Sequence, residues 1–363
     1  MTYEQHAREA ARQFQIPGKM VEISPYGSGH INDTYCAVFS QSGKVVRYII
    51  QRINPTVFQN PPLLMQNIQR VTEHLSEKLA DHPESNRRVL RLVRTRDGSV
   101  WYQDANGNYW RSFHFIERTR SYDAISSVTQ AFEVAKAFGE FQQLLFDLPA
   151  PPLHETIPDF HNTPKRFTAL EQALDKDIAG RAVLAKPEIE FALERKAITS
   201  VLLDANLRMR VTHNDTKLNN VLLDDLTGAG VCVIDLDTVM PGLALYDFGD
   251  MVRTSTSPTL EDEQDLSKVT MQFPMFEALV RGYLSFAGNF LTDAEEQLLA
   301  FSGKLITFEQ GIRSLTDYLR GDLYYKVSRE GHNLDRSRTQ FRLVESIEQQ
   351  EEKMSRLVEN VLK

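Results

Sequence analysis

The stretch VTHNDTKLNN at residues 211–220 constrains the fold and the chemistry of this chain more than any other part of its sequence. Asp215 can accept a proton from a hydroxyl group, and Lys217, two residues further on, can neutralise a phosphate oxygen. Asn220 ends the stretch, and Asp235 follows after two short apolar runs. The side chains of these last two residues offer hard oxygen atoms, which suit Mg²⁺ and are poor ligands for a soft metal. The stretch therefore predicts a magnesium site beside a basic carboxylate.

Two runs rich in Val, Leu and Ile, at residues 221–223 and 231–234, enclose a turn that contains Asp, Thr and Gly. Apolar runs joined by a glycine-containing turn predict a β-hairpin. Because a hairpin folds its two ends back together, we expect Asn220 at its start and Asp235 at its end to lie side by side.

This set of side chains has the chemistry of phosphoryl transfer, which needs an oriented hydroxyl group, metal ligands and a cation near the transferred phosphate. The pattern H-x-D-x-K-x-x-N, followed by a hairpin and an Asp, resembles the catalytic and metal-binding loops of the eukaryotic-like kinases. No Arg follows His213, and Asp-Leu-Asp stands at residues 235–237 in place of Asp-Phe-Gly. Both differences are typical of small-molecule kinases, such as those for aminoglycosides, choline and homoserine.

The composition is that of an ordinary globular protein of about two domains, since 42% of the 363 residues are hydrophobic and 25% are charged. A net charge of −8 without a basic block argues against a nucleic acid partner. No apolar run approaches the roughly 18 residues of a membrane span, and residues 1–15 lack the apolar core of a signal peptide. We therefore expect no membrane partner. Cys36 and Cys232 lie in apolar runs, which favours reduced, buried thiols in a cytoplasmic protein.

The N-terminal part is predicted to form strand, glycine loop, strand, turn and strand. Glycines let backbone N–H groups approach an anion, so the loop is a candidate for binding the phosphates of a nucleotide. Asn32 takes the place of the third glycine of the protein-kinase loop. The strands are expected at residues 21–26, 34–39 and 45–51, and the loop residues of interest are Gly27, Gly29, His30 and Asn32.

The end of the third strand departs from the kinase pattern, which has a phosphate-pairing lysine there. This chain has Gln51 at that position and Arg52 next to it, whereas Lys44 lies in the preceding turn and is too far away. Either Arg52 reaches the nucleotide phosphates, or Gln51 does so as a neutral donor.

Apolar residues at helical spacing predict a helix at residues 62–80. A strand ending at residue 116 would lead into a hinge at Ile116 and Glu117, where backbone groups bind adenine; the order of the elements alone places this hinge. From residue 118 onward the pattern is mainly helical. Strands are expected at 89–94, 99–103 and 109–116, and helices at 127–146, 187–204, 304–320 and 340–362.

Two further features have a plain structural interpretation. The letters D-F-G at residues 247–249 follow no suitable hairpin, so Asp247 and Asp250 are expected to begin a helix or to brace a loop. Glu309 and Arg313 are four residues apart in a predicted helix, where an exposed ion pair of small value is the simplest interpretation.

Five segments resemble the bacterial N-acetylhexosamine 1-kinases, a family within the aminoglycoside phosphotransferase and choline kinase-like group of the protein-kinase-like superfamily. The segments are YGSGHIN, VTHNDTKLNN, IDLDTVMPG, LYDFGD and GIRSLTDYLRGDLYY, and the resemblance extends from about residue 20 to the C-terminus. These enzymes use ATP and Mg²⁺ to phosphorylate the anomeric hydroxyl group of N-acetylglucosamine (GlcNAc) or N-acetylgalactosamine (GalNAc). The resemblance implies that this chain is a sugar 1-kinase.

The resemblance also implies roles for individual residues. Asp215 corresponds to the catalytic base, and Asn220 and Asp235 correspond to the metal ligands, as the spacing had already indicated. Lys217 would offset charge that develops on the transferred phosphate. In-line attack by the sugar 1-hydroxyl group on the γ-phosphate is the implied mechanism.

Contacts with the acceptor sugar are implied for Thr238, Arg313 and Tyr324. Spacing alone would leave Arg313 and Tyr324 as surface residues. The family also has Gln at the end of the third strand, which favours Gln51 as the residue near the nucleotide phosphates.

The fold that the resemblance implies is α+β, bilobal and protein-kinase-like. Residues 1–117 would form a small N-lobe with a nucleotide-binding antiparallel sheet and one helix. Residues 118–363 would form a larger, mainly helical C-lobe with the catalytic loop and the sugar site. The expected partners are ATP and a small sugar, and the expected assembly is a monomer or a weak homodimer.

Two alternatives stay open at this stage. One is a kinase of another small alcohol, of the homoserine, choline or aminoglycoside type. Arg313 at the acceptor site argues against a cationic acceptor of this kind. The other is a nucleotide-binding pseudokinase, which the missing strand lysine suggests.

Overall fold

The computed structural model describes residues 3–27, 29 and 31–363 of the chain. The chain forms two compact units and passes between them several times. The domain division predicted between residues 117 and 118 stays a prediction. The smaller unit comprises Met1–Asp123, Leu144–Pro158 and Leu222–Pro241, and the larger unit comprises Ala124–Gln143, Asp159–Val221 and Gly242–Lys363.

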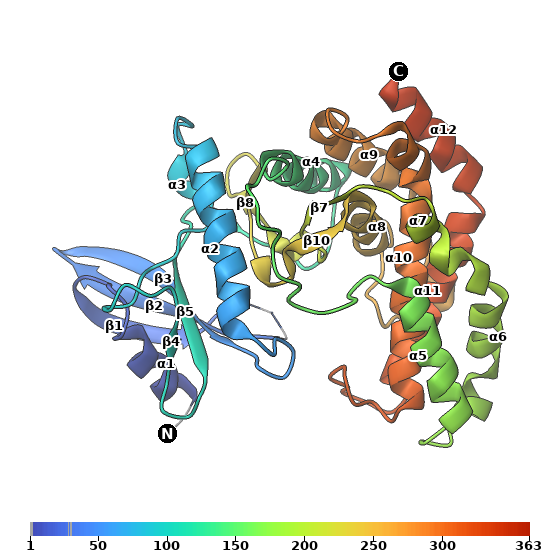
Figure 1. Cartoon of the computed structure of the whole chain (residues 1–363), viewed down its shortest axis with the longest axis horizontal. Helices are drawn as coiled ribbons and strands as arrows, with labels where there is room; N and C mark the ends of the chain where they lie inside the picture. The colour runs from blue at the N-terminus through green and yellow to red at the C-terminus, as the bar shows by residue number, and fades with distance from the viewer. Residues whose placement is uncertain (1–2, 28, 30) are drawn as a thin grey trace. The chain divides into compact units, whose positions relative to one another are not determined.

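An antiparallel sheet in the order β1-β2-β3-β5-β4 forms the centre of the smaller unit (Figure 1). The strands are β1 (Lys19–Pro25), β2 (Asp33–Gln41), β3 (Lys44–Ile53), β4 (Tyr102–Gln103) and β5 (Tyr109–His114), and the helices are α1 (Tyr3–Ala11), α2 (Pro61–Lys78) and α3 (Ser85–Arg88). The first three predicted strands and the helix predicted at residues 62–80 are confirmed, with small shifts at their ends.

Alternation along the strands builds the core of this unit. Tyr35, Ala37 and Phe39 in β2 are buried at a spacing of two residues, as are Tyr48 and Ile50 in β3. These side chains pack with three alanines of α1 and with Phe14, Ile23, Val93 and Trp110. The buried face of the sheet thus holds α1, while polar residues of β3, including the one at the predicted lysine position, point to the other face.

The strand predicted at residues 89–94 is wrong as a regular element. Leu92 forms only an isolated bridge with Phe113, and the N–H of Val93 donates to the carbonyl of Ser112 at 2.8 Å. The strand predicted at 99–103 shrinks to the two residues of β4, which pairs with the beginning of β5. Two short segments therefore share one edge of β5, where the sequence suggested two full strands.

The hairpin predicted after the catalytic loop is confirmed. β8 (Val221–Asp224) and β9 (Gly230–Val233) are neighbours in a small sheet with β6 (Thr119–Arg120). The turn between them rests on Asp224, whose Oδ1 accepts the N–H groups of Leu226 and Thr227, each at 3.0 Å. A hydrogen bond from Arg87, together with these N–H groups, lowers the pKa of the Asp224 carboxyl.

Helices make up most of the larger unit (Figure 1). Together with the small sheet-based unit this gives a mixed α+β fold, which confirms the predicted class. The helices are α4 (Val128–Leu144), α5 (Thr163–Lys176), η1 (Ala182–Ala185), α6 (Lys186–Glu194), η2 (Lys196–Ser200), α7 (Val201–Asp204), η3 (Leu218–Asn220), α8 (Ala244–Ser255), η5 (Leu266–Lys268), α9 (Phe273–Ala287), α10 (Asp293–Leu319), α11 (His332–Glu348) and α12 (Glu351–Leu362). η4 (Leu236–Thr238) lies in the smaller unit, and β7 (Met209–Thr212) pairs with β10 (Met240–Leu243).

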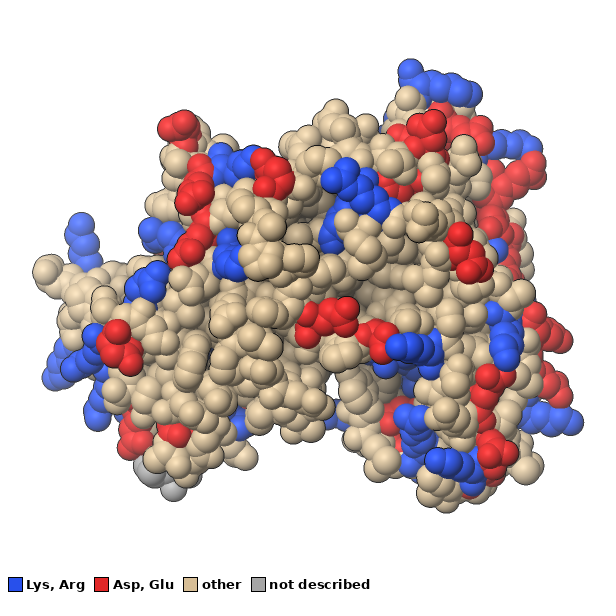
Figure 2. Space-filling model, in the orientation of Figure 1, with Lys and Arg blue, Asp and Glu red and all other residues tan. Residues whose placement is uncertain are grey.

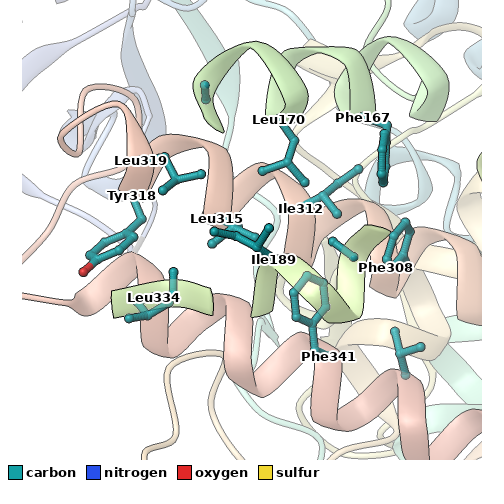
Figure 3. Close-up of a cluster of buried hydrophobic side chains, with 14 residues drawn as sticks. Phe167, Leu170, Ile189, Phe308, Ile312, Leu315, Tyr318, Leu319, Leu334 and Phe341 are labelled. Atoms are coloured by element: carbon teal, nitrogen blue, oxygen red, sulfur yellow. The ribbon is translucent and has the colours of Figure 1, made fainter. Parts of the chain in front are cut away.

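Helix α10 is the central element of the larger unit. Its apolar side chains from Phe308 to Leu319 pack between α5 and α6 on one side and α11 on the other (Figure 3). Phe308 stacks on Phe167 and Phe341, with ring centroids 6.5 and 5.9 Å apart. A capping box at Thr292 and Glu295 fixes the start of the helix. α10 is therefore a rigid support for any functional side chain that it carries.

Two helices predicted as continuous are interrupted. The segment at residues 187–204 divides into α6, η2 and α7 at Arg195, which pairs with Glu348 through two hydrogen bonds of 3.0 Å and stacks on Phe191. The segment at 340–362 divides into α11 and α12 near Gln350, whose amide donates to the carbonyl of Met271 at 2.9 Å. Periodicity does not register such tertiary contacts.

None of the helices in the described part of the chain has the length and apolarity needed to cross a membrane. On the face drawn in Figure 2, acidic and basic side chains are interspersed among neutral ones, and the coloured residues form no broad basic surface of the kind that binds nucleic acid.

Candidate active site

The predicted catalytic loop, residues 213–220, follows β7, and hydrogen bonds to Asp247 of α8 fix its start. This carboxylate is fully buried and accepts the backbone N–H groups of His213 and Asn214 at 2.9 and 2.7 Å. Gln142 donates to it at 2.6 Å and in turn accepts the hydroxyl of Tyr283 at 2.6 Å. Burial raises the pKa of Asp247, although His213 and the two N–H groups oppose this effect. The prediction that Asp247 braces a loop is confirmed.

Close packing beneath the loop demands glycine at residue 242. A Cβ atom there would lie 2.2 Å from Oγ1 of Thr212 and 2.7 Å from Oδ1 of Asn214. Asn214 itself has a positive φ of 63°, a left-handed conformation that residues with a side chain rarely adopt. The loop thus leaves β7 through a tight bend that brings the next residue, Asp215, out of the buried layer.

Asp215, Lys217 and Asn220 lie together in the larger unit. Oδ2 of Asp215 accepts hydrogen bonds from Nζ of Lys217 at 3.1 Å and from Nδ2 of Asn220 at 3.2 Å. Burial raises the pKa of the Asp215 carboxyl, but the charges of Lys217 and His213 outweigh burial, and the net pKa is lowered. The side chain of Asp215 keeps 25% of its surface exposed. It is therefore an accessible, ionised carboxylate that can accept a hydrogen bond from a hydroxyl group.

The amide of Asn220 is oriented as a metal ligand would need to be. Its Nδ2 donates to the backbone carbonyl of Asp215 at 2.8 Å as well as to the carboxylate, and among the described residues no hydrogen bond reaches its Oδ1. Asp235 is the exposed residue between buried Val233 and buried Leu236, and its φ of 60° turns the chain sharply after β9.

Asn220 and Asp235 suit Mg²⁺ better than a metal ion whose ligands all come from protein side chains. Among the described residues, no group of three or more His, Cys, Asp or Glu side chains is arranged to hold a metal ion. Mg²⁺ usually binds through one or two protein oxygens together with substrate phosphates and water. Asn220 belongs to the larger unit and Asp235 to the smaller one, so their sharing of one ion stays a prediction.

A buried ion pair in the smaller unit lies beside Gln51, the residue at the position of the kinase strand lysine. Arg111 of β5 is opposite Gln51 of β3 in the register of the sheet, and its Nε donates to Oε1 of Gln51 at 3.0 Å. Its other nitrogens bind both carboxylate oxygens of Asp237, and the two side chains are 2% and 3% exposed. Asp237 also accepts a hydrogen bond from Asn32 at 2.6 Å. The glycine loop, β5 and the turn after β9 are therefore joined through one carboxylate, and Arg111 connects this carboxylate with Gln51 of β3.

The contacts of Gln51 and Arg52 help to decide which of them can reach the nucleotide phosphates. Arg52 pairs with Asp33 and donates to Asn108 at 3.1 Å, so its charge is already engaged. Gln51 donates to the hydroxyl of Thr34 at 2.8 Å, on the same side of the sheet as Arg111. Gln51 is therefore the better candidate for a neutral donor near phosphate.

The other predicted nucleotide residues lie at two places in the smaller unit. Gly27 has a φ of 80°, and a Cβ atom at Gly27 or Gly29 would meet no neighbour within 4 Å, so this backbone is open. His30 lies outside the described residues. Ile116 is buried against Val231 and Cys232, and its carbonyl accepts the hydroxyl of Thr119 at 2.8 Å. Glu117 is exposed and pairs with Arg47.

Arg313 and Glu309 on α10 do not form the exposed pair that their spacing predicted. Glu309 is 1% exposed and accepts hydrogen bonds from His161 at 2.8 Å and Thr163 at 2.7 Å. Arg313 is partly buried, its guanidinium lies 5.1 Å from the centre of the Phe160 ring, and it forms no salt bridge among the described residues. The prediction of a solvent-exposed ion pair is wrong, because the burial of α10 covers this face as well.

A second arginine lies near the same aromatic side chain. Arg166 donates to the backbone carbonyl of Phe160 from Nε and Nη2 at 3.2 and 3.0 Å. Burial, followed by the charge of Arg313, lowers the pKa of Arg166. The surroundings of Arg313 therefore include a second arginine and aromatic rings, together with the charge of the buried Glu309.

The other two residues predicted to contact the acceptor are Tyr324, in the loop after α10, and Thr238, at the end of η4. The carboxylate of Asp317 shapes the loop after α10, because it accepts the backbone N–H groups of Leu323, Tyr324 and Tyr325 at 2.8–2.9 Å. Tyr324 is 56% exposed and packs edge-on against Tyr325. Thr238 ends η4 in the smaller unit and is buried. Asp317 was missed from the sequence, where it is one acidic residue in a helix rich in them.

Several solved structures resemble this chain in overall fold. One is a microcompartment-associated aminopropanol kinase, 17% identical, with 97% of this chain and 98% of that chain covered and a TM-score of 0.55. Another is the choline kinase of Cryptosporidium parvum Iowa II, 14% identical, with 99% of both chains covered and a TM-score of 0.58. A third is a spectinomycin phosphotransferase in complex with ADP and spectinomycin, 12% identical, with 97% and 99% covered and a TM-score of 0.58. At these identities the likeness shows the fold alone.

The family match defines the class of the protein, a phosphotransferase, and the similar structures show that its fold is kinase-like. The phosphotransferase enzyme family, abbreviated APH, matches residues 22–279, which is more than half of the chain. The chain belongs to this family.

Proposed function

We propose that the protein transfers the γ-phosphate of ATP to the anomeric hydroxyl group of an N-acetylhexosamine, GlcNAc or GalNAc, and releases the sugar 1-phosphate. The observation that carries this choice of acceptor is the guanidinium of Arg313, which lies against Phe160 with no carboxylate partner among the described residues. Solved structures of similar fold include kinases named for aminopropanol and choline. An acceptor with an amine or ammonium group would be repelled by Arg313 and Arg166, whereas a neutral sugar offers oxygens that accept from a guanidinium.

In this proposal the catalytic loop orients the attacking hydroxyl group. Asp215 accepts the hydrogen bond of the sugar 1-hydroxyl and takes its proton as the new O–P bond forms. The low pKa of Asp215 suits this role, because a hemiacetal hydroxyl is more acidic than an ordinary alcohol. Lys217 lies beside it and stabilises the negative charge on the transferred phosphate.

The nucleotide would be held by the smaller unit. Gly27, Gly29, His30 and Asn32 would approach its phosphates through backbone N–H groups, and Gln51 would donate from its side chain. Ile116 and Glu117 would hydrogen-bond adenine through their backbone groups. One of the solved structures of similar fold contains ADP, which supports a nucleotide substrate here.

Asn220 and Asp235 would hold Mg²⁺, which supplies positive charge to the nucleotide phosphates when bound. A structure with Mg²⁺ and a non-hydrolysable ATP analogue is expected to place the ion about 2.0–2.1 Å from Oδ1 of Asn220 and from a carboxylate oxygen of Asp235. An ion more than about 3 Å from both side chains would contradict the assignment.

The test of the proposed function is a panel of acceptors scored by ATP consumption and by product identity. The panel includes GlcNAc, GalNAc, glucose, galactose, homoserine, choline, aminopropanol and spectinomycin. We expect turnover with the two N-acetylhexosamines and a product whose phosphate is on the anomeric carbon. Turnover with choline or aminopropanol alone would replace the sugar by an aminoalcohol. ATP binding without turnover of any acceptor would favour a pseudokinase.

A further inference from the structure

His161 contacts both the catalytic loop and helix α10, and each of its ring nitrogens faces a hydrogen-bond acceptor. Nδ1 lies 2.8 Å from Oε1 of Glu309, and Nε2 lies 3.1 Å from the backbone carbonyl oxygen of Asn214. The imidazole is buried, with 5% of its side chain exposed, and it packs against the rings of Phe160 and Tyr246 at 4.7 and 5.0 Å.

The hydrogen-bond partners define the protonation of this ring. A carbonyl oxygen cannot donate, and a neutral imidazole has only one N–H group. The second oxygen of Glu309 accepts from the hydroxyl of Thr163 at 2.7 Å. With an ionised Glu309, both bonds of His161 form only when the ring carries two protons. His161 and Glu309 then make a buried ion pair that ends on the catalytic loop.

The charges around the pair favour this ionised form over a neutral histidine beside a protonated glutamate. Burial lowers the pKa of His161, but the charge and hydrogen bond of Glu309 and the charge of Asp250 outweigh burial and raise it. Burial raises the pKa of Glu309, but His161 and Arg313 outweigh it and lower the value. The groups that face the ring are Glu309 from α10, Tyr246 and Asp250 from α8, and the carbonyl of Asn214, while Arg313 acts on Glu309.

The bond to Asn214 has a mechanical consequence for Asp215. Asn214 adopts a left-handed backbone conformation, with a φ of 63°, which is uncommon for residues other than glycine. Its N–H is held by Asp247, and its carbonyl is held by His161. Without the contact to His161, the peptide that joins Asn214 to Asp215 loses one of the bonds that fix it, although its N–H still faces Nδ1 of His213 at 3.3 Å. Glu309 lies one helical turn before Arg313. The His161–Glu309 pair therefore connects α10, which carries Arg313, with the loop that carries Asp215.

We propose that His161 is a positioning residue: its imidazolium ring, fixed by Glu309, holds the carbonyl of Asn214 and thereby fixes Asp215 relative to Arg313. The proposal rests on the proposed function in that Asp215 is taken as the base. The deprotonated ring, which keeps one N–H group, cannot make both bonds. Turnover should then fall as the pH rises through the pKa of His161.

The kinetic test compares wild type, His161→Gln and His154→Gln across pH 6–9. Glutamine supplies a donor to only one of the two acceptors, so His161→Gln is expected to lower kcat about 5-fold at pH 7, while KM for ATP and acceptor changes less than about 2-fold. The alkaline fall in kcat of the wild type should be lost in this variant. His154 is exposed and hydrogen-bonds Gln66, so His154→Gln should match wild type throughout.

A second variant keeps the proposal testable if His161→Gln folds poorly. Glu309→Gln retains the shape of the side chain but removes the charge that stabilises the imidazolium, so the alkaline fall in kcat should begin at a lower pH. A merely structural role would lower activity without moving the profile. An unchanged pH profile in both variants would overturn the proposal.

The protonation state is measured separately by ¹⁵N NMR of histidine-labelled protein at pH 7.5. Both ring nitrogens of His161, assigned by loss of the signal in His161→Gln, should be protonated. A neutral ring would overturn the proposal. This measurement needs no acceptor, and the kinetic test uses whichever alcohol the panel shows to be phosphorylated. Failure of the sugar assignment therefore leaves both measurements valid and is distinct from failure of this inference.

Discussion

Asp215→Asn is expected to lower kcat by two or more orders of magnitude, because an amide cannot take the proton of the acceptor hydroxyl and general-base positioning contributes about 10²- to 10⁴-fold. Asparagine has nearly the same shape, and its Oδ1 can still accept from Lys217 or Asn220. Folding and ATP binding should therefore change little. The measurements are steady-state kinetics with GlcNAc, a binding curve for ATP and a melting curve on the same preparation.

A matched control for this prediction is Asp204→Asn. Asp204 is an exposed carboxylate at the end of α7 that accepts a hydrogen bond from Ser200, so the same chemical change there should leave kcat unaltered. If Asp215→Asn retains a tenth or more of the wild-type turnover, Asp215 does not act as the base.

The buried His161–Glu309 pair also predicts a pH dependence of stability. The pKa of His161 in the folded protein lies above its ordinary value of 6.5. A raised folded-state pKa gives a stabilising contribution that is complete below pH 6.5 and is lost as the pH rises through the folded-state value. The Tm of wild type should therefore exceed that of His161→Gln most at pH 6, and the difference should narrow toward pH 9. A difference that grows with pH would contradict the sign of this effect.

The features that sequence predicted well are local ones. The catalytic loop and the β8–β9 hairpin lie within one stretch of chain, where residue type, turn chemistry and spacing carry the information. Asp247 could be predicted as a bracing carboxylate because the letters D-F-G at residues 247–249 follow no suitable hairpin, unlike Asp235, which follows one directly. The glycine turn that contains Gly27 and Gly29 is open, as expected, whereas its role in binding a nucleotide and the hinge at Ile116 and Glu117 stay predictions.

The features that sequence missed are pairings between distant residues. Arg111 and Asp237 are 126 residues apart, and His161 and Glu309 are 148 apart, so no local pattern connects them. Periodicity also failed for a physical reason at α10. It identifies a buried face only when another face meets solvent, and α10 is covered on nearly all sides. Glu309 was therefore assigned to the surface although it is one of the most buried carboxylates of the chain.

Arg313→Ala is expected to lower kcat/KM for N-acetylhexosamine at least about 10-fold, a free energy of roughly 1.4 kcal/mol. A guanidinium presents several donors in a fixed fork, which suits a ring hydroxyl and a neighbouring oxygen of a sugar. When the side chain is removed, the sugar oxygens that it served lose their partner in a partly buried site. KM for ATP should not change, because the predicted nucleotide contacts belong to other residues.

The stability of the same variant separates a role in binding from a role in folding. Arg313 forms no salt bridge among the described residues, so its removal breaks no direct ion pair. Burial disfavours its charge, whereas Tyr325 and Glu309 favour it and raise its pKa, so loss of the charge has opposing effects on stability. Tm should therefore change little. Arg313→Lys keeps the charge but loses the planar fork, and it should recover only part of the activity. Arg320→Ala, an exposed arginine just after the same helix, is the matched control and should behave as wild type.

A comparison of GlcNAc with aminopropanol as acceptors tests the role of Arg313 most directly. If Arg313 repels cationic acceptors, Arg313→Ala should improve the ratio of aminopropanol to GlcNAc turnover, because the loss for the sugar is accompanied by relief of repulsion for the amine. Both substrates are measured with each of the three arginine variants. Unchanged sugar kinetics in Arg313→Ala would leave Arg313 as a packing residue on Phe160 and would remove the main reason to prefer a sugar over another small alcohol.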